Sequence, residues 1–412
     1  MAKKSERNII TALDIGTSKV VALIGEVNPA GMIELIAMGC HPSRGLKRGV
    51  VVDIEATVQS IQRAVQAAEL MAGCEVRSVY TGIAGSHIRS LNSHGIVAIR
   101  DKEVSQADVE RVIDAAKAVA IPADQKILHI LPQEFMIDHQ GNIHEPVGMA
   151  GVRLESRVHI VTGSVSAAQN ITKCVRRCGL EVNDIVLEQL ASSHAVLTDD
   201  EKELGVCLVD IGGGTTDIAL FCAGSIQYTA VIPIAGDQVT NDIAMALRTP
   251  TKSAEAMKLN YGCALSEMAN ADQMIDVLSV NDRPGRQISS KALSDVVAAR
   301  YEELFMLVRH EIRQSGFDSM LAAGIVLTGG ASKVTGALEL AERCFDMPVR
   351  QGTAQNLVGL TEATSNPSLA TAVGLLLHGF RQQYDGGYRV PHMHQTRTGM
   401  WTRMRQWVNG NF

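Results

Sequence analysis

Two short segments of the chain, 196 residues apart, carry the same arrangement of chemically useful residues. Each ends an apolar run with an aspartate, Asp14 in the first segment and Asp210 in the second. A turn rich in glycine and hydroxyl groups follows, and then a second apolar run, which predicts a strand, a tight turn and a strand. The turn residues are Gly16, Thr17, Ser18 and Lys19 in the first segment and Gly212, Gly213, Gly214, Thr215 and Thr216 in the second.

The chemistry of these turns is that of an anion site beside a cation site. Glycine lets backbone N–H groups approach an anion closely, the hydroxyl groups add donors, and each aspartate can hold a cation. The first segment alone could be an ordinary hairpin, but three consecutive glycines weaken a strand and indicate a functional turn. Two such turns that face each other would bind a polyphosphate and its metal.

A third glycine-rich element follows the apolar run 323–328. Gly329 and Gly330 end this predicted strand, and a helical pattern begins near Gly336. Because glycine has no side chain, a flat ring could lie directly against the backbone at these two residues. The chain contains neither a GxxxxGK[ST] phosphate loop nor a GxGxxG turn that opens a helix, so P-loop and dinucleotide-binding folds are excluded.

Composition sets the remaining limits. A chain of 412 residues with 46% apolar and 20% charged residues is long enough for two globular domains. The net charge of −6 argues against a nucleic-acid partner. The eight cysteines are scattered through apolar runs, as expected for free thiols in a reducing cytoplasm. We expect no membrane-spanning segment and no signal peptide.

Periodicity divides the first half of the chain into three parts. Residues 1–83 predict three strands, a helix over 54–72 and a strand over 79–83, and residues 166–203 predict two helices around a strand. Between them, residues 84–165 predict a separate α+β module. Ser105 and Asp108 form a capping box before its helix, and strand-like runs cover 126–131, 134–138 and 158–162.

Residues 204–380 predict a second domain. Within it, the segment 243–320 is polar and helical, and its longest helix covers 289–315. The loop before this helix carries Arg283 and Arg286, which we expect to be exposed.

The last 32 residues differ in composition from the rest. Residues 381–399 are polar and lack periodicity, which is typical of a flexible linker. Residues 400–412 predict a short amphipathic helix with tryptophan on its apolar stripe, which favours an anchor lying in the plane of a membrane over a helix that packs back on the protein. The residues of this anchor are Met400, Trp401, Arg403, Met404, Arg405, Trp407 and Val408.

The order of these motifs resembles the actin–Hsp70–sugar-kinase superfamily. DxGT at Asp14, DxGGGTxD at Asp210 and a late strand ending in TGG at Gly330 match its two phosphate motifs and its adenosine motif. Residues 188–193 and 370–375 resemble its two connecting helices, and residues 253–258 resemble the AExxK segment of bacterial actins. Within the superfamily, residues 8 to about 380 and the tail are most similar to the FtsA family of bacterial cell-division proteins.

The resemblance implies an α/β fold of the actin-like, ribonuclease H-like type, with two domains around a nucleotide cleft and an inserted subdomain. It implies ATP and Mg²⁺ as cofactors, with Mg²⁺ held by Asp14 and Asp210 largely through water. Glu188 would orient the attacking water, with Asp210 as a second catalytic candidate. The remaining nucleotide contacts would come from the two turns and from Gly236, Asp237, Glu255, Lys258, Gly329 and Gly330.

For function, the resemblance implies a protein that polymerises on the cytoplasmic face of the inner membrane at the division site. Its partners would be the C-terminal tail of FtsZ, contacted by Arg283 and Arg286, further copies of itself, anionic lipid and other division proteins. Any ATPase activity would be slow, with nucleotide acting mainly as an assembly ligand. The alternatives are a pilus-assembly ATPase of the same superfamily and a sugar-kinase-like phosphotransferase.

Overall fold

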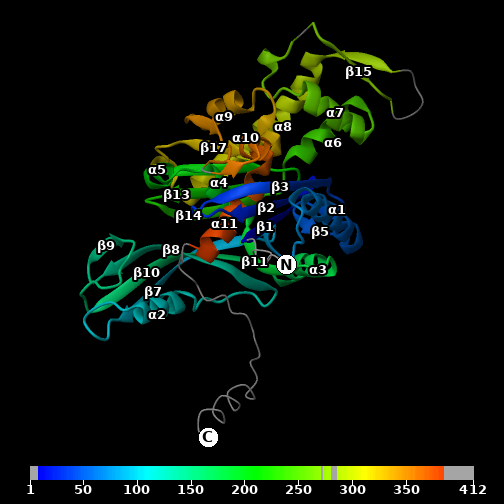
Figure 1. Ribbon diagram of the computed structural model, residues 1–412. Helices are drawn as coiled ribbons and strands as arrows, with labels where there is room; N and C mark the ends of the chain where they lie inside the picture. Colours follow the sequence, from blue (N-terminus) through cyan, green and yellow to red (C-terminus); the bar gives the residue numbers. More distant parts are fainter. Residues whose placement is uncertain (1–7, 271, 280–284, 356, 385–412) are drawn as a thin grey trace, which may run out of the picture.

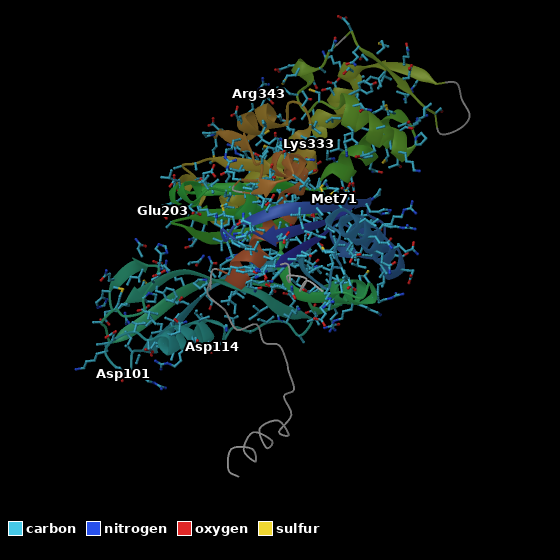
Figure 2. The ribbon with its side chains drawn as sticks, viewed as in Figure 1. Met71, Asp101, Asp114, Glu203, Lys333 and Arg343 are labelled. Atoms are coloured by element: carbon cyan, nitrogen blue, oxygen red, sulfur yellow. The ribbon has the colours of Figure 1, made fainter. Side chains whose placement is uncertain are left out.

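The computed structural model describes residues 8–270, 272–279, 285–355 and 357–384. Two α/β domains, each built on its own sheet, lie against each other, and a third module with a separate sheet projects from the first domain (Figure 1). Asp101 and Asp114, labelled in Figure 2, lie in this third module. The predicted membrane anchor, residues 400–412, lies outside the described residues.

The first sheet has the strand order β11-β6-β1-β2-β3-β19. β1, β2 and β3 form an antiparallel meander, and β6 and β11 extend it in parallel with β1. The predicted helix over 54–72 is found as α1, whose N-cap Asp53 accepts a hydrogen bond from the Ala56 N–H. The bounds are β1 Ile9–Ile15, β2 Lys19–Val27, β3 Ile33–Pro42, β6 Ser78–Ile83, β11 Glu181–Leu187, β19 Val358–Gly359 and α1 Ile54–Ala72.

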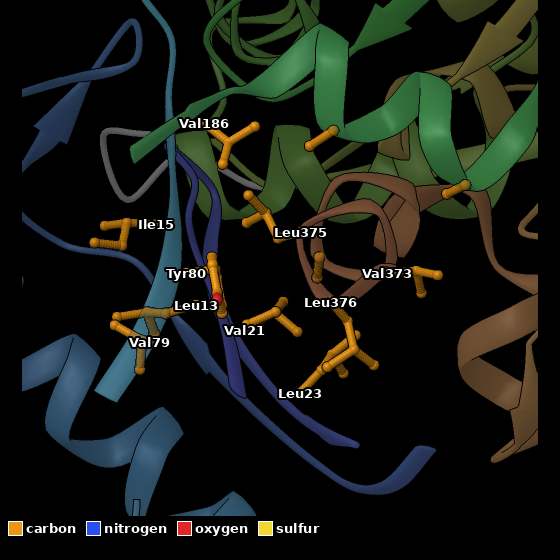
Figure 3. Close-up of a cluster of buried hydrophobic side chains, with 14 of the residues drawn as sticks. Leu13, Ile15, Val21, Leu23, Val79, Tyr80, Val186, Val373, Leu375 and Leu376 are labelled. Atoms are coloured by element: carbon orange, nitrogen blue, oxygen red, sulfur yellow. The ribbon is translucent and has the colours of Figure 1, made fainter. Parts of the chain in front are cut away.

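Helices cover both faces of this sheet, which is why its strands are nearly continuous apolar runs. α1 and α3 (Val165–Arg177) cover one face, and α4 (Glu188–Val196) and α11 (Ala370–Tyr384) cover the other. Figure 3 shows Leu375 and Leu376 of α11 on the side of the helix that faces Val21 and Leu23 of the sheet. This contact forms the largest buried cluster of the molecule's described part.

The second sheet has the order β14-β13-β12-β17-β18. Successive residues of β12 point to opposite faces of this sheet. Val209 packs in the buried hydrophobic cluster that α6, α7, α8 and α9 form with the second sheet, whereas Leu208 packs in the buried cluster of the first domain. The bounds are β12 Val206–Ile211, β13 Thr216–Cys222, β14 Ser225–Ile232, β17 Ile325–Thr328, β18 Val349–Gln351, α6 Gly236–Leu247, α7 Thr251–Tyr261, α8 Ser290–Ser315 and α9 Ala337–Phe345.

The inserted module is a four-stranded antiparallel sheet with one helix, α2, and its own buried cluster. The predicted capping box is present at Ser105 and Asp108. Two of the predicted strands are wrong as separate elements, because one strand, β8, runs through Pro132, and the pairing with β10 shifts register there. The polar strands β7 and β9 were not predicted. The bounds are β7 Arg89–Ala98, β8 Gln125–Ile137, β9 Gln140–Ile143, β10 Arg153–Ser164 and α2 Gln106–Ala116.

The inserted module also contacts the second domain along β14. The Gln133 Nε2 donates to the Ile226 carbonyl at 2.9 Å, and the Ser225 hydroxyl donates to the Gln133 carbonyl at 2.6 Å. His159 is buried and lies 3.0 Å from the Thr229 hydroxyl, and its burial lowers its pKa to about 4. This seam connects the module to β14, which pairs with β13, the strand that follows the second glycine-rich turn.

The chain returns to the first domain before residue 380, which corrects two predicted boundaries. β19 pairs with β3, and α11 packs on β1, β2 and α4, so this last part of residues 204–380 belongs to the first domain's core. The linker does not begin at Arg381 either, because α11 continues to Tyr384. The side chains of Gln382 and Gln383 donate to Asp184 and Tyr80 and hold this last turn on the first sheet.

The remaining elements are short. The hairpin β15–β16 precedes α8 and was not predicted, and α8 itself begins one residue after the predicted start. Near the start of α8, Leu293 is buried and Ala292 is exposed. The bounds are β4 Leu46–Lys47, β5 Val50–Val51, α5 Asp199–Leu204, β15 Met274–Val277, β16 Arg286–Ser289 and α10 Thr361–Ser365.

Candidate functional site

The two glycine-rich turns meet each other across the space between the domains. A Cβ atom on Gly213 would lie 2.9 Å from the Ser18 Cβ, and one on Gly214 would lie 2.6 Å from the Thr17 hydroxyl oxygen. Side chains at these two positions would therefore push the turns apart. The sequence requires glycine here because two backbones approach closely.

Most of the turn N–H groups are free to bind a ligand. Within the described residues, the N–H groups of Thr17, Ser18, Gly213, Gly214 and Thr215 donate no hydrogen bond. Five free donors in two facing turns form a ready anion site.

Gly16 and Gly212 differ from the other turn residues. Their N–H groups close the turns, donating to the carbonyls of Lys19 at 3.1 Å and Thr215 at 2.9 Å. The Gly16 N–H is therefore already paired within its turn, while Gly16 itself lines the cleft.

A cleft of about 420 Å³ extends from the turns. Thr216 is the exception among the predicted nucleotide residues, because its side chain is buried in β13 and donates to the Ile234 carbonyl at 2.8 Å. The predicted residues that line the cleft are Asp14, Gly16, Thr17, Ser18, Lys19, Glu188, Asp210, Gly212, Gly213, Gly214, Thr215, Gly236, Asp237, Glu255, Lys258, Gly329 and Gly330.

One end of the cleft is formed by α6 and α7. The Lys258 ammonium lies 3.0 Å from the Gly236 carbonyl, 2.8 Å from the Thr240 hydroxyl and 2.8 Å from a Glu255 carboxylate oxygen. Thr240 also donates to Glu255. Because these contacts fix both charged side chains, Glu255 and Lys258 present a polar wall at this end of the cleft.

Gly329 closes the opposite wall, directly behind Asp210. It has a positive φ of 88°, and a Cβ atom there would lie 2.4 Å from an Asp210 carboxylate oxygen. Gly330 has more room, since its Cβ would meet only the Ser368 Cβ at 3.5 Å. Lys333, labelled in Figure 2, follows in the same turn and also lines the cleft.

Asp210 connects the cleft to both helices that pass between the domains. Its carboxylate accepts hydrogen bonds from Ser192 of α4 at 2.5 Å and from Thr371 of α11 at 3.1 Å. The two hydroxyl groups also lie 3.0 Å from each other. A change at Asp210 therefore alters the contacts of both helices.

α4 and α11 cross at very short distance beneath this network. A Cβ atom on Gly374 would lie 1.8 Å from the Ala191 carbonyl oxygen. This glycine allows the two helix backbones to touch.

Four carboxyl groups share the floor of the cleft. Burial raises the pKa of Asp14 to about 7 and that of Asp217 to about 8, and the Asp210 charge adds to both effects. Burial also raises the pKa of Asp210, and it raises that of Glu188 well above the usual value, with Asp14 adding to the effect. Ionisation of this cluster is unfavourable until a cation binds nearby.

Cationic groups of the protein oppose this charge only in part. The Lys19 ammonium donates to the Ser368 hydroxyl at 2.7 Å, and burial lowers its pKa although the Asp14 charge favours the charged form. Lys19 thus points into the cleft and reaches the segment before α11.

The cleft fits a polyphosphate that carries a hydrated divalent cation. No three His, Cys, Asp or Glu side chains of the described residues form a group that could hold a metal ion directly. Mg²⁺ commonly keeps several of its water ligands, so carboxylates can position it without direct coordination. The Asp217 Oδ1 is buried and accepts no hydrogen bond from the described residues, so it offers one uncompensated acceptor at the cleft. Asp14 and Asp210 could hold such an ion through water.

Several cleft residues were not predicted. Asp217 ends the second motif, so the motif itself could have identified it. Ser368 lines the cleft from the short helical turn before α11, and Thr371 from the first turn of α11. Ser192 of α4 contacts the site through Asp210, and ordinary helix patterns give no signal of these polar roles. Their importance depends on the tertiary contact with Asp210.

The two arginines predicted to contact a partner peptide differ in what the structure describes. Arg283 belongs to the undescribed residues 280–284. Arg286 begins β16 and is exposed, as expected, and its guanidinium donates to the Leu247 carbonyl at 2.9 Å. No helix in the described ranges is long and apolar enough to cross a membrane.

The two-domain architecture with two facing turns defines an actin-like ATPase fold. The solved structure titled PilM-PilN type IV pilus biogenesis complex aligns with a TM-score of 0.65 and 17% identity, over 90% of this chain and 98% of that chain. MreB5 of Spiroplasma citri bound to ADP aligns with a TM-score of 0.55 and 16% identity, over 91% and 97%. At these identities the similarity establishes the fold alone.

Sequence comparison identifies the family. Residues 207–374 match the family model described as cell division protein FtsA, and residues 85–162 match the SHS2 domain inserted in FtsA. Over the full length of both chains, the chain is 60% identical to cell division protein FtsA of Pseudomonas aeruginosa and 45% identical to that of Escherichia coli K12. The chain belongs to the FtsA family of cell-division proteins.

Proposed function

We propose that this division protein binds MgATP in the cleft, polymerises, and attaches the FtsZ ring to the cytoplasmic face of the inner membrane through residues 400–412. One observation carries the nucleotide part of the proposal. The free N–H groups of two turns face each other beside carboxyl groups whose ionisation needs a cation. A polyphosphate with Mg²⁺ supplies both missing partners.

Each group has a distinct role in this proposal. The free N–H groups of Thr17, Ser18 and residues 213–215 hold the phosphates, and Lys19 adds positive charge. Asp14 and Asp210 position the hydrated metal, which screens charge on the phosphates when bound. Glu188 orients water, so turnover is possible, although slow hydrolysis suffices for a ligand that controls assembly.

The hydrogen bonds of Asp210 connect nucleotide binding to domain position. Ser192 and Thr371 lie on the two connecting helices, so a metal that attracts the Asp210 carboxylate changes the contacts of both helices. Two domains held in one orientation present fixed surfaces to neighbouring copies, which favours a filament. The FtsZ tail and other division proteins would bind this assembly.

The membrane part of the proposal depends on the sequence of the tail. Arg403 and Arg405 would each contribute about 1 kcal/mol at an anionic surface, and the tryptophans add apolar burial. One short helix therefore binds weakly and reversibly. Many tails on one filament bind by avidity, which multiplies affinity by roughly 10²–10⁴.

Co-sedimentation with anionic vesicles tests this function, with and without ATP and a peptide of the FtsZ tail. We expect the full chain to pellet with vesicles, to pellet more strongly with ATP, and to carry the peptide with it. Deletion of residues 400–412 should leave the protein and peptide in the supernatant. Equal pelleting of the full and shortened chains would contradict the role of the tail.

A sugar kinase remains the alternative from a different class. Phosphate transfer from ATP to sugars, measured on the same two chains, separates the proposals, because a kinase would keep its activity after the tail is removed.

A further inference from the structure

Four basic side chains surround a shallow depression of about 370 Å³ outside the nucleotide cleft. We call this the basic cluster, and it consists of Lys126 at the start of β8 and Lys173, Arg176 and Arg177 on α3. Its other lining residues are small or polar, Ala168, Gln169 and Thr172. The whole chain has a net charge of −6, so this concentration of positive charge is a local feature.

Much of this charge is not neutralised. Arg177 pairs with Glu55 at 2.7 Å, but both side chains are about half exposed, and such a pair is weak. Lys173 and Arg176 form no ion pair with the residues that the structure describes. Partial burial lowers the pKa of Lys126, and the nearby Asp184 charge offsets part of this effect. An anion bound beside Lys126 would stabilise the charged form of its ammonium group further.

The basic cluster lies close to the point where the chain leaves the described structure. α3 packs beside β11, the edge strand of the first sheet. On the same strand, Asp184 accepts a hydrogen bond from Gln382 in the last turn of α11 and contacts His378 at 3.2 Å. α3 and α11 lie on opposite faces of the first sheet, and both approach its edge strand β11, where the Asp184 charge also acts on Lys126 of the basic cluster.

Fifteen residues, 385–399, separate Tyr384, where the described chain ends, from the start of the proposed membrane helix at Met400. A flexible polar chain of this length spans roughly 20 Å. A tail bound at a bilayer would therefore hold the surface around β11 close to the lipid headgroups.

We propose that the basic cluster binds the phosphates of anionic phospholipids and forms a second contact between the protein and the membrane. This inference rests on the proposed membrane role of the tail. The cluster offers charge without a large apolar side chain, which suits headgroups better than a peptide, because peptide sites usually contain an apolar anchor. Two contacts, the tail and the cluster, fix the orientation of the protein as well as its distance from the bilayer.

Charge reversal in the full chain tests the proposal. Lys173→Glu with Arg176→Glu changes two exposed residues, and Lys291→Glu with Arg313→Glu makes the same change in charge on exposed positions of α8, in the second domain. We expect the first pair to weaken binding to phosphatidylglycerol-rich vesicles by roughly 30-fold, since each basic residue near a membrane contributes about 5-fold. The control variant, Lys291→Glu with Arg313→Glu, should bind these vesicles as the parent does. The charge-preserving variant, Lys173→Arg with Arg176→Lys, should also bind as the parent does.

A tethered chain separates failure of this inference from failure of the tail. In this chain a hexahistidine tag replaces residues 385–412, and nickel-chelating lipid holds the protein on the vesicles. The replacement keeps the folded part of the protein, because all three buried clusters lie within residues 10–377. We expect Lys126 and Lys173 to be protected from amine acetylation on phosphatidylglycerol vesicles and not on phosphatidylcholine vesicles. Equal labelling on both, or protection only by a soluble acidic peptide, would overturn the proposal, whether or not the natural tail binds lipid.

Discussion

Replacement of Asp14 by asparagine should stabilise the nucleotide-free protein while weakening its binding of MgATP. Asp14 is 8% exposed, and burial raises its pKa from 3.8 to about 7. A carboxyl whose pKa is higher in the folded than in the unfolded protein lowers stability as pH rises from about 4 to 7, and the full penalty persists above 7. The shift corresponds to roughly 4 kcal/mol, and solvent in the cleft relieves part of it.

We therefore expect Asp14→Asn to increase the free energy of unfolding by roughly 1–3 kcal/mol near pH 8 and by little near pH 4. Urea unfolding of the nucleotide-free parent and variant at both pH values measures this difference. Asp114→Asn is the control, because the Asp114 side chain is 70% exposed, and we expect a change below about 0.5 kcal/mol at either pH. A variant that is less stable than the parent near pH 8 would refute the view of Asp14 as a charge that needs a cation.

Three further substitutions test the close contacts of the fold. Gly329→Ala should abolish ATP binding in calorimetry, because its Cβ would approach a carboxylate oxygen to 2.4 Å, whereas Gly330→Ala should bind nearly as the parent does; equal affinities would contradict the described geometry. Gly374→Ala should destabilise the protein by about 1–3 kcal/mol in urea, since its Cβ would collide with the Ala191 carbonyl, and an unchanged midpoint would show that the helices can separate freely. Ser105→Ala removes the N-cap of α2 and should cost about 1 kcal/mol, and hydrogen exchange in α2 that matches the parent would rule out this role of the cap.

Local patterns in the sequence predict the elements that carry the phosphate turns. The Asp14 and Asp210 turns are hairpin tips, and the helix over 54–72 has the predicted bounds. These features follow from short-range chemistry: glycine at turns, apolar runs in buried strands and a capping aspartate before a helix. The family resemblance adds the order in which the elements assemble.

Long-range packing explains what the sequence pattern misses. The apolar face of α11 fits either domain equally well by periodicity, and only its contacts with β1 and α4 assign it to the first. The strand β7 is mostly polar and exposed on its outer face, so it gives no alternating signal. In the candidate site, Ser192 and Thr371 gain their role from a carboxylate that is distant in sequence.

Calorimetric titration of ATP into the full chain, in Mg²⁺ and in chelator, tests whether the cleft binds a metal-bound polyphosphate. We expect the parent to bind ATP with an affinity that falls strongly when Mg²⁺ is removed. The Asp210→Asn variant should stay folded but lose this dependence on Mg²⁺. A parent that binds no ATP, or binds it with equal affinity in chelator and in Mg²⁺, would contradict the assignment of the two facing turns and their aspartates as a site for a metal-bound polyphosphate.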